Sequence, residues 1–246
     1  MDSLTQILLG AAIGHAAIGQ KEGKNAAIWG AILGMLPDLD VLSFLWFDPV
    51  ASLSIHRSAS HSFIIAILIA PVLGRILRRI HIKGKTTKQE WAVFVGLVFI
   101  THIFIDLLTV YGTQILWPIS NYAFSFDSIF IIDPLYTIPL ALGLLLSLNG
   151  KADSKIRFRA NAVGLIISSI YLTWGMGMKL HVHSSFHQGL ASKGLLVEQL
   201  MTAPTPFNSV LWMGLGTKGD SLYASVYSVL DKRPPKIGRA SGRGRG

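Results

Sequence analysis

Ionisable residues stand inside or beside apolar segments at four places in this chain. They are His15, the run Pro37-Asp38-Leu39-Asp40, the run His56-Arg57-Ser58-Ala59-Ser60-His61, and the pair His102 and Asp106. Ionisable residues within membrane segments are rare and usually functional. Four such places in one chain indicate a functional site.

The spacing of these residues favours convergence on a metal ion. His102 and Asp106 are four residues apart, so they share one helix face and can offer a nitrogen and an oxygen to one ion. Asp38 and Asp40 alternate across a leucine, so an extended chain after Pro37 would point both to one side. A serine-rich turn separates His56 from His61 and can fold the two rings towards each other.

The absence of cysteine restricts any metal site to histidine and carboxylate ligands. Such a set suits zinc or manganese and can hold one or two divalent ions. The predicted ligands are Asp38, Asp40, His61, His102, Asp106 and His15. The predicted catalytic residues are His56, as ligand or general acid, and Arg57, which can hold an anionic substrate oxygen through two hydrogen bonds.

Each motif also has an ordinary structural interpretation. An aspartate after proline often forms a turn or helix cap, which applies to Asp38. His102 and Asp106 could be a buried hydrogen-bonded pair that joins two helices, Arg57 a surface charge near lipid headgroups, and His15 a packing residue. Weaker candidates are Asp133, His181, His183 and His187.

The elements that must position these residues are apolar helices. Of the 246 residues, 51% are hydrophobic and 14% charged, whereas soluble domains have about 25% charged residues. A bilayer span needs about 20 apolar residues. We expect spans at Ser3–Gly19, Ala26–Phe47, His61–Leu77, Glu90–Val110, Ile129–Leu148 and Phe158–Met178. The prediction is an all-α polytopic membrane protein with about six transmembrane helices in residues 1–178.

The basic residues are distributed unevenly between the expected loops. Loops 20–25, 75–89 and 149–159 carry twelve Lys and Arg, whereas loops 48–60 and 111–128 carry only Arg57. Short basic loops stay on the cytosolic side. We therefore expect an inner-membrane protein with both termini extracytoplasmic, and with the predicted ligands of the second, third and fourth segments at the extracytoplasmic side.

The region after residue 178 differs from the rest of the chain. Residues 179–231 are predicted to form a small extracytoplasmic segment with β-leaning stretches at Val210–Met213 and Leu222–Val229. Such a short segment cannot build a robust core alone, so it should pack on the membrane domain. Residues 232–246 form a Gly- and Arg-rich tail, disordered or added, with six of the 22 Lys and Arg. The net charge of +9 therefore does not indicate nucleic-acid binding.

Several segments together carry a family resemblance. MDSLTQILLGAAIG, GAILGMLPDLDVL, HRSASHS and THIFIDLLTVYGTQILWP resemble bacterial inner-membrane proteins described as metal-dependent hydrolases, one branch of which is described as LexA-regulated. The resemblance covers residues 1 to about 140, and APTPFNSVLW is similar to a downstream portion of some members. The family usually has His at the position of Gln6, and some members have Glu at that of His15. A looser likeness links the chain to zinc-dependent phospholipase C and single-strand nuclease enzymes, which use His and Asp ligands.

These observations predict a membrane-embedded, metal-dependent hydrolase. The resemblance implies hydrolysis, and the depth of the site favours a phosphoester or ester of a lipid or lipid-linked substrate at the outer face of the inner membrane. The predicted partners are the bilayer and this substrate, not nucleic acid. The alternative is a non-catalytic membrane protein, either a metal-ion carrier or a scaffold whose buried polar groups join helices.

Overall fold

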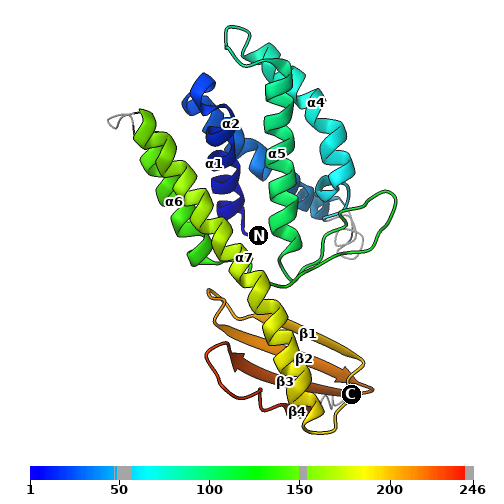
Figure 1. The fold of residues 1–246 in the computed structure, drawn as a ribbon. Coiled ribbons are helices and arrows are strands. Elements are labelled where there is room, and N and C mark those ends of the chain that lie inside the picture. Colours follow the sequence, from blue (N-terminus) through cyan, green and yellow to red (C-terminus); the bar gives the residue numbers. More distant parts are fainter. Residues whose placement is uncertain (47, 49–56, 150–153, 242–246) are drawn as a thin grey trace.

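The computed structural model describes residues 1–46, 48, 57–149 and 154–241. These residues form a helical bundle followed by a small sheet, with the amino terminus near the end of the bundle that faces the sheet (Figure 1). The helices are α1 (Ser3–Glu22), α2 (Lys24–Met35), the 3-10 helices η1 (Pro37–Leu45) and η2 (Ala59–His61), α4 (Phe63–Ile80), α5 (Lys88–Leu107), α6 (Pro134–Leu148) and α7 (Ser154–Ala191).

Polar caps fix where the central helices begin. Ser62 accepts hydrogen bonds from the first backbone amides of α4, so His61 is held immediately before that helix. Thr87 and Glu90 form a capping box at the start of α5. From that start, the 20 residues of α5 carry His102 and Asp106 to its far end.

Helix α5 lies at the centre of the bundle. Its buried side chains include Trp91, Phe94, Val98 and Ile103, which are at most 1% exposed. They pack against residues of α1, α2 and α4 in one hydrophobic core. The helix that carries two of the predicted ligands is therefore held on several sides.

Helices α1 and α2 approach closely through glycines. A Cβ on Gly30 would lie 2.1 Å from the carbonyl oxygen of Gly10, and a Cβ on Gly10 would lie 2.2 Å from that of Gly30. Only glycine permits this distance, because real Cβ atoms do not approach backbone oxygens so closely. The contact fixes the position of α2, whose Gly34 carbonyl reaches the ring of His102.

The prediction of about six membrane-spanning helices is not supported. Within the described residues, α5 and the part of α7 at Lys155–Ala191 are long and apolar enough to cross a membrane, and α2 with η1 adds a third span if this pair, bent by 43°, counts as one. Helix α4 has 18 residues but contains Arg75, Arg78 and Arg79, and α6 has only 15 residues. Exposed apolar side chains, such as Leu68 of α4 and Leu145 of α6, still give the bundle a lipid-facing surface.

The carboxyl-terminal region forms an antiparallel sheet with the strand order β1-β2-β3-β4. Its strands are β1 (Gln199–Pro204), β2 (Leu211–Lys218), β3 (Ser221–Ser228) and β4 (Gly238–Ser241). The β character predicted for Val210–Met213 and Leu222–Val229 is confirmed by β2 and β3. The sequence did not indicate β1 or β4, and β4 lies within the segment expected to be a tail.

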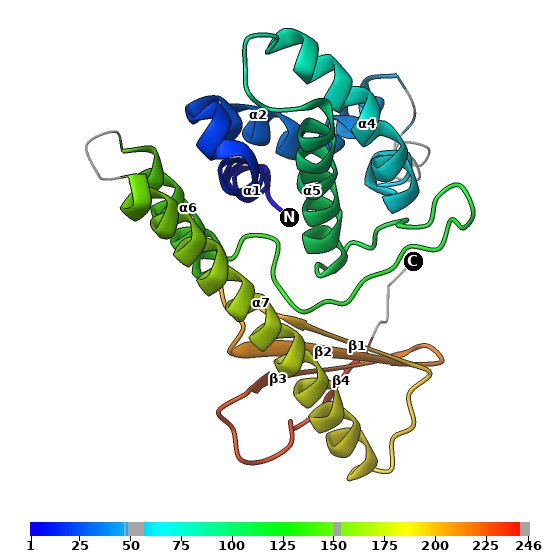
Figure 2. The ribbon, with the colours of Figure 1, turned by 45° about the horizontal axis from the view of Figure 1, so that its top comes forward.

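Helix α7 connects the bundle to the sheet without a break (Figures 1 and 2). Its 38 residues span roughly 57 Å, whereas the hydrocarbon core of a bilayer is about 30 Å thick. It runs through the boundary expected at residue 178, and its last turns pack Val182 and Phe186 against Trp212 and Tyr227 of the sheet. The carboxyl-terminal segment therefore packs on an extension of the helical domain, as expected for a segment too short to fold alone.

The glycine contact between α1 and α2 gives a first prediction. Replacing Gly30 by Ala places a methyl group against the Gly10 carbonyl, which should cost about 1–3 kcal/mol of stability and displace Gly34 from His102. We expect a lower melting temperature for Gly30→Ala in detergent. Gly177→Ala is the control, because a Cβ there meets nothing within 4 Å. Equal melting temperatures for the two variants would contradict the close contact.

Candidate metal centre

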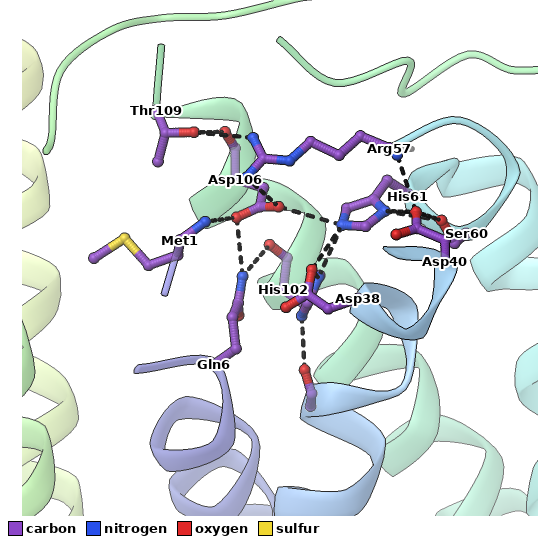
Figure 3. A network of polar contacts seen from close by, with 11 residues as sticks. Met1, Gln6, Asp38, Asp40, Arg57, Ser60, His61, His102, Asp106 and Thr109 are labelled. Carbon is purple, nitrogen blue, oxygen red and sulfur yellow. Dashed lines mark hydrogen bonds and ion pairs between the residues drawn. The ribbon is translucent and has the colours of Figure 1, made fainter. Parts of the chain in front are cut away.

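Four predicted ligands converge at the end of the bundle near the sheet (Figure 3). Asp38 comes from η1, His61 from η2, and His102 and Asp106 from α5. One ligand atom from each lies within 4.8 Å of the others. His61, His102 and Asp106 are buried, and the Asp38 side chain is 18% exposed. The convergence expected from the sequence is present for these four residues.

The distances in this cluster match the edges of a metal coordination sphere. His61 Nε2 lies 3.1 Å from His102 Nε2, 3.2 Å from Asp106 Oδ2 and 3.4 Å from Asp38 Oδ1. His102 Nε2 lies 3.5 Å from the same Asp38 oxygen. Ligands about 2.0–2.1 Å from a tetrahedral ion are roughly 3.3 Å apart. These four separations are close to that value, so the four residues could hold one ion.

Partners of the two Nδ1 atoms orient both rings so that their Nε2 atoms point into the cluster. His102 Nδ1 donates to the Gly34 carbonyl oxygen at 2.8 Å, which leaves the Nε2 lone pair for a ligand. His61 Nδ1 lies 3.4 Å from Asp40 Oδ2 and 2.9 Å from Ser60 Oγ. Metal-binding histidines have such a carbonyl or carboxylate partner on the second nitrogen.

The electrostatics of the cluster also fit a cation. Two imidazole lone pairs and two carboxylates face one point, and negative groups repel one another in a buried site unless a positive charge compensates them. Asp38 Oδ2 is buried and has no hydrogen-bond partner among the described residues. Nitrogen and carboxylate donors without sulfur suit zinc or manganese. The residues present therefore fit a divalent metal ion.

Asp40 lies behind His61, outside the group of four. Its Oδ2 accepts hydrogen bonds from the Arg57 amide at 2.9 Å and from Ser60 Oγ at 2.5 Å. The expectation of an extended chain after Pro37 is wrong, because Pro37 opens the 3-10 helix η1. Residues two apart diverge around the axis of such a helix. Asp38 therefore faces Nε2 of His61, and Asp40 faces Nδ1 of the same ring.

Arg57 lies beside the cluster and is 8% exposed. Its Nη2 is 3.5 Å from Asp106 Oδ2, its Nη1 donates to Thr109 Oγ1 at 3.3 Å, and its guanidinium lies 5.1 Å from the Tyr111 ring centroid. Its buried Nε has no hydrogen-bond partner among the described residues. Arg57 has a positive φ of 60°, a strained conformation typical of functional sites.

Two further residues were predicted for the site, and the structure describes only one of them. His15 lies on α1, where its two ring nitrogens are 3.0 and 3.3 Å from Ser147 Oγ. The structure thus places it in helix packing, the alternative role expected for it. His56 lies outside the described residues, so its predicted role as ligand or general acid stays a prediction.

The weaker candidates lie elsewhere in the molecule. Asp133 caps α6, accepts from the Leu135 amide at 3.0 Å and the Tyr171 hydroxyl at 2.7 Å, and burial raises the pKa of its carboxyl. His183 and His187 face each other at 3.2 Å on the part of α7 beside the sheet.

Several polar groups around the cluster were not predicted as site residues. Gln6 Nε2 donates to Asp106 Oδ1 at 3.1 Å, and the Met1 amino group contacts the same oxygen. Gln6 could have been predicted as a site residue, because the family that this chain resembles usually has His at that position. Ser60 and Thr109 had no comparable signal, since short hydroxyl side chains are common at helix ends.

A buried group of His and Asp residues between apolar helices is typical of a membrane protein with a metal centre. The family model described as YdjM inner membrane protein matches residues 1–182, so the chain belongs to this family. It is the family of LexA-regulated inner-membrane proteins classed as metal-dependent hydrolases, which confirms the resemblance found in the sequence. No curated protein and no solved structure showed a match to the chain.

The position of Asp40 behind His61 gives a second prediction. Because Asp40 orients a ligand ring, Asp40→Ala should weaken metal affinity about 10–100-fold and leave the number of ions bound at saturation unchanged. Asp106→Ala should lower that number. Metal titration followed by elemental analysis of detergent-purified protein measures both quantities, with the exposed Asp220→Ala as control. If Asp40→Ala lowers the bound number as Asp106→Ala does, Asp40 is itself a ligand.

Proposed function

We propose that the protein is a membrane-embedded, metal-dependent hydrolase that cleaves a phosphoester or ester of a lipid or lipid-linked substrate. The observation that carries the proposal is the buried group of Asp38, His61, His102 and Asp106, with ligand atoms within 4.8 Å of one another. Membership of the inner-membrane family supports it. A bound zinc or manganese ion, alone or as one of two, would activate water and polarise the scissile group.

The residues around the cluster have distinct proposed roles. Arg57 holds an anionic oxygen of the substrate, since its buried guanidinium adjoins Asp106 and carries a free Nε–H among the described contacts. Asp40 and the Gly34 carbonyl keep the rings of His61 and His102 in the orientation that ligation requires. His56, as a ligand or general acid, remains part of the proposal.

An apolar cavity beside the cluster supports a lipid substrate. It has a volume of about 160 Å³ and is lined by Leu36, Pro37, Ser60, Ile65, Ala66, Ile69 and Phe99. Ser60 lines this cavity and also forms hydrogen bonds with Asp40 and His61. The hydrocarbon chain of a substrate would lie in this cavity while its ester approaches the cluster.

The arrangement of charge supports a site at the outer face of the inner membrane. The cluster lies at the end of the bundle near the sheet, whereas the α1–α2 and α4–α5 connections lie at the opposite end (Figure 1). Lys21 is in the last turn of α1, Arg78 is in the last turn of α4, and Lys85 lies between α4 and α5. Basic connections remain cytosolic. Both termini, the sheet and the cluster would then be extracytoplasmic.

A third prediction separates a metal enzyme from a structural scaffold. His102→Ala should abolish both metal binding and hydrolysis of a panel of lipid phosphomonoesters, phosphodiesters and carboxylic esters in micelles. A chelator should lower the melting temperature of the unaltered protein, since the free energy of metal binding also stabilises the fold. His187→Ala is the matched control, because His187 is exposed and outside the cluster.

The scaffold alternative predicts a different pattern. Removing one member of a buried polar pair leaves its partner unsatisfied at a cost of about 1–3 kcal/mol. His102→Ala would then lower the melting temperature, whereas chelator and added zinc or manganese would leave it unchanged. That combination would refute the hydrolase proposal.

A fourth prediction concerns orientation in the membrane. A reporter inserted between α4 and α5, after Ile82, should read cytosolic because this connection is basic. A reporter inserted after Pro206, between β1 and β2, should read extracytoplasmic. The reverse pattern would move the cluster to the cytosolic face and exclude a substrate in the outer leaflet.

A further inference from the structure

A second cavity with a different chemical character lies between α1 and α7. Its volume is about 450 Å³, and it is lined by His15, Gly19, Gln20, Lys155, Arg157, Phe158 and Arg159. His15 is nine positions beyond Gln6 in the sequence, which is roughly 14 Å along the helix. The cavity is therefore separate from the metal centre and lies towards the basic end of the bundle.

Among the described residues that line this cavity, three are cations and none is a carboxylate. Lys155 and Arg159 are exposed and four residues apart, so they project from one face of α7. Arg157 is half-buried, and its Nε donates to the Ser147 carbonyl oxygen at 2.9 Å. This bond anchors the guanidinium at the cavity, and a guanidinium has further N–H groups with which it can bind an anion.

The first turn of α7 strengthens the positive field in the cavity. The helix begins at Ser154 and has no acidic residue in its first turn. The amino end of a helix carries partial positive charge and unpaired amide donors, and both favour anions. Here the lysine and the two arginines add full charges to that end. The field and the donors therefore both favour an anion with several oxygen acceptors.

The wall of the cavity also contains the aromatic side chain of Phe158, beside His15. The ring of His15 lies 6.2 Å from that of Phe158 and is held by Ser147. A ligand with a charged group beside a less polar portion would match this wall. Arginine forks bind phosphate oxygens in pairs, and basic pockets between membrane helices bind phospholipid headgroups.

We propose that this cavity binds a phosphate group, carried either by the headgroup of an anionic phospholipid or by a soluble phosphate compound. The site is independent of the proposed hydrolysis, because no residue that lines it belongs to the metal centre. The proposal also gives a role to His15, which lies outside the candidate metal centre: its ring forms part of the cavity wall.

Native mass spectrometry of the full chain in detergent tests this proposal. Phosphatidylglycerol should bind more tightly than phosphatidylcholine, and the double variant Lys155→Gln/Arg159→Gln should weaken that binding about 25-fold, since each basic residue near a headgroup contributes about fivefold. The matched control is Lys85→Gln/Lys88→Gln, which removes the same charge from the α4–α5 connection. Metal content should stay unchanged in both variants.

Inorganic phosphate distinguishes the two sources. If phosphate at millimolar concentration displaces phosphatidylglycerol, the phosphate group alone is recognised and a soluble ligand is assigned. If it does not, the lipid headgroup is assigned. Equal losses in the two double variants, or equal binding of the two lipids together with no binding of phosphate, would overturn the proposal.

Discussion

The structure depends on one electrostatic constraint. Carboxylate oxygens and imidazole nitrogens, all of them electron-rich, surround a single buried point. Two imidazole Nε2 atoms lie 3.1 Å apart, and carboxylates of Asp38 and Asp106 adjoin them. Such a group is stable in a medium of low dielectric constant only when positive charge compensates it. Asp38, Asp40 and Asp106 contribute three negative charges, of which Arg57 and the Met1 amino group on Asp106 offset two. The remaining negative charge and the imidazole nitrogens make the cluster suited to a cation.

Backbone groups as well as side chains hold this cluster in place. The glycines between α1 and α2 allow the two backbones to meet. Helix α2 then presents the carbonyl oxygen of Gly34 to His102. The 3-10 geometry of η1 sends Asp38 and Asp40 to opposite nitrogens of one ring. A change about one helical turn from the Gly34 carbonyl, such as one at Gly30, can therefore alter the orientation of His102, because closely packed backbones have little freedom to relax.

The sequence predicted the parts of the site that follow from local periodicity. His102 and Asp106 share a face of any helix, and ionisable residues in apolar segments are informative wherever they occur. The role of Asp40 did not follow, because it depends on whether the chain after Pro37 is extended or 3-10. The position of His15 did not follow either, because it depends on how far along α1 the bundle places the cluster.

The number of membrane spans was overestimated, because apolar segments such as α6 are shorter as helices than as runs of sequence. Strands β1 and β4 had no clear alternation of their own and form by pairing with β2 and β3.

The unbroken course of α7 has a mechanical consequence. A continuous helix is stiff, so the sheet attached to its last turns cannot swivel independently of the part that packs against α6 and α1. Over its length of roughly 57 Å, a tilt of about 5° at the bundle would move the far end by about 5 Å. Helix α7 therefore ties the sheet to the bundle, so a small tilt of the bundle in the bilayer moves the sheet by several ångströms.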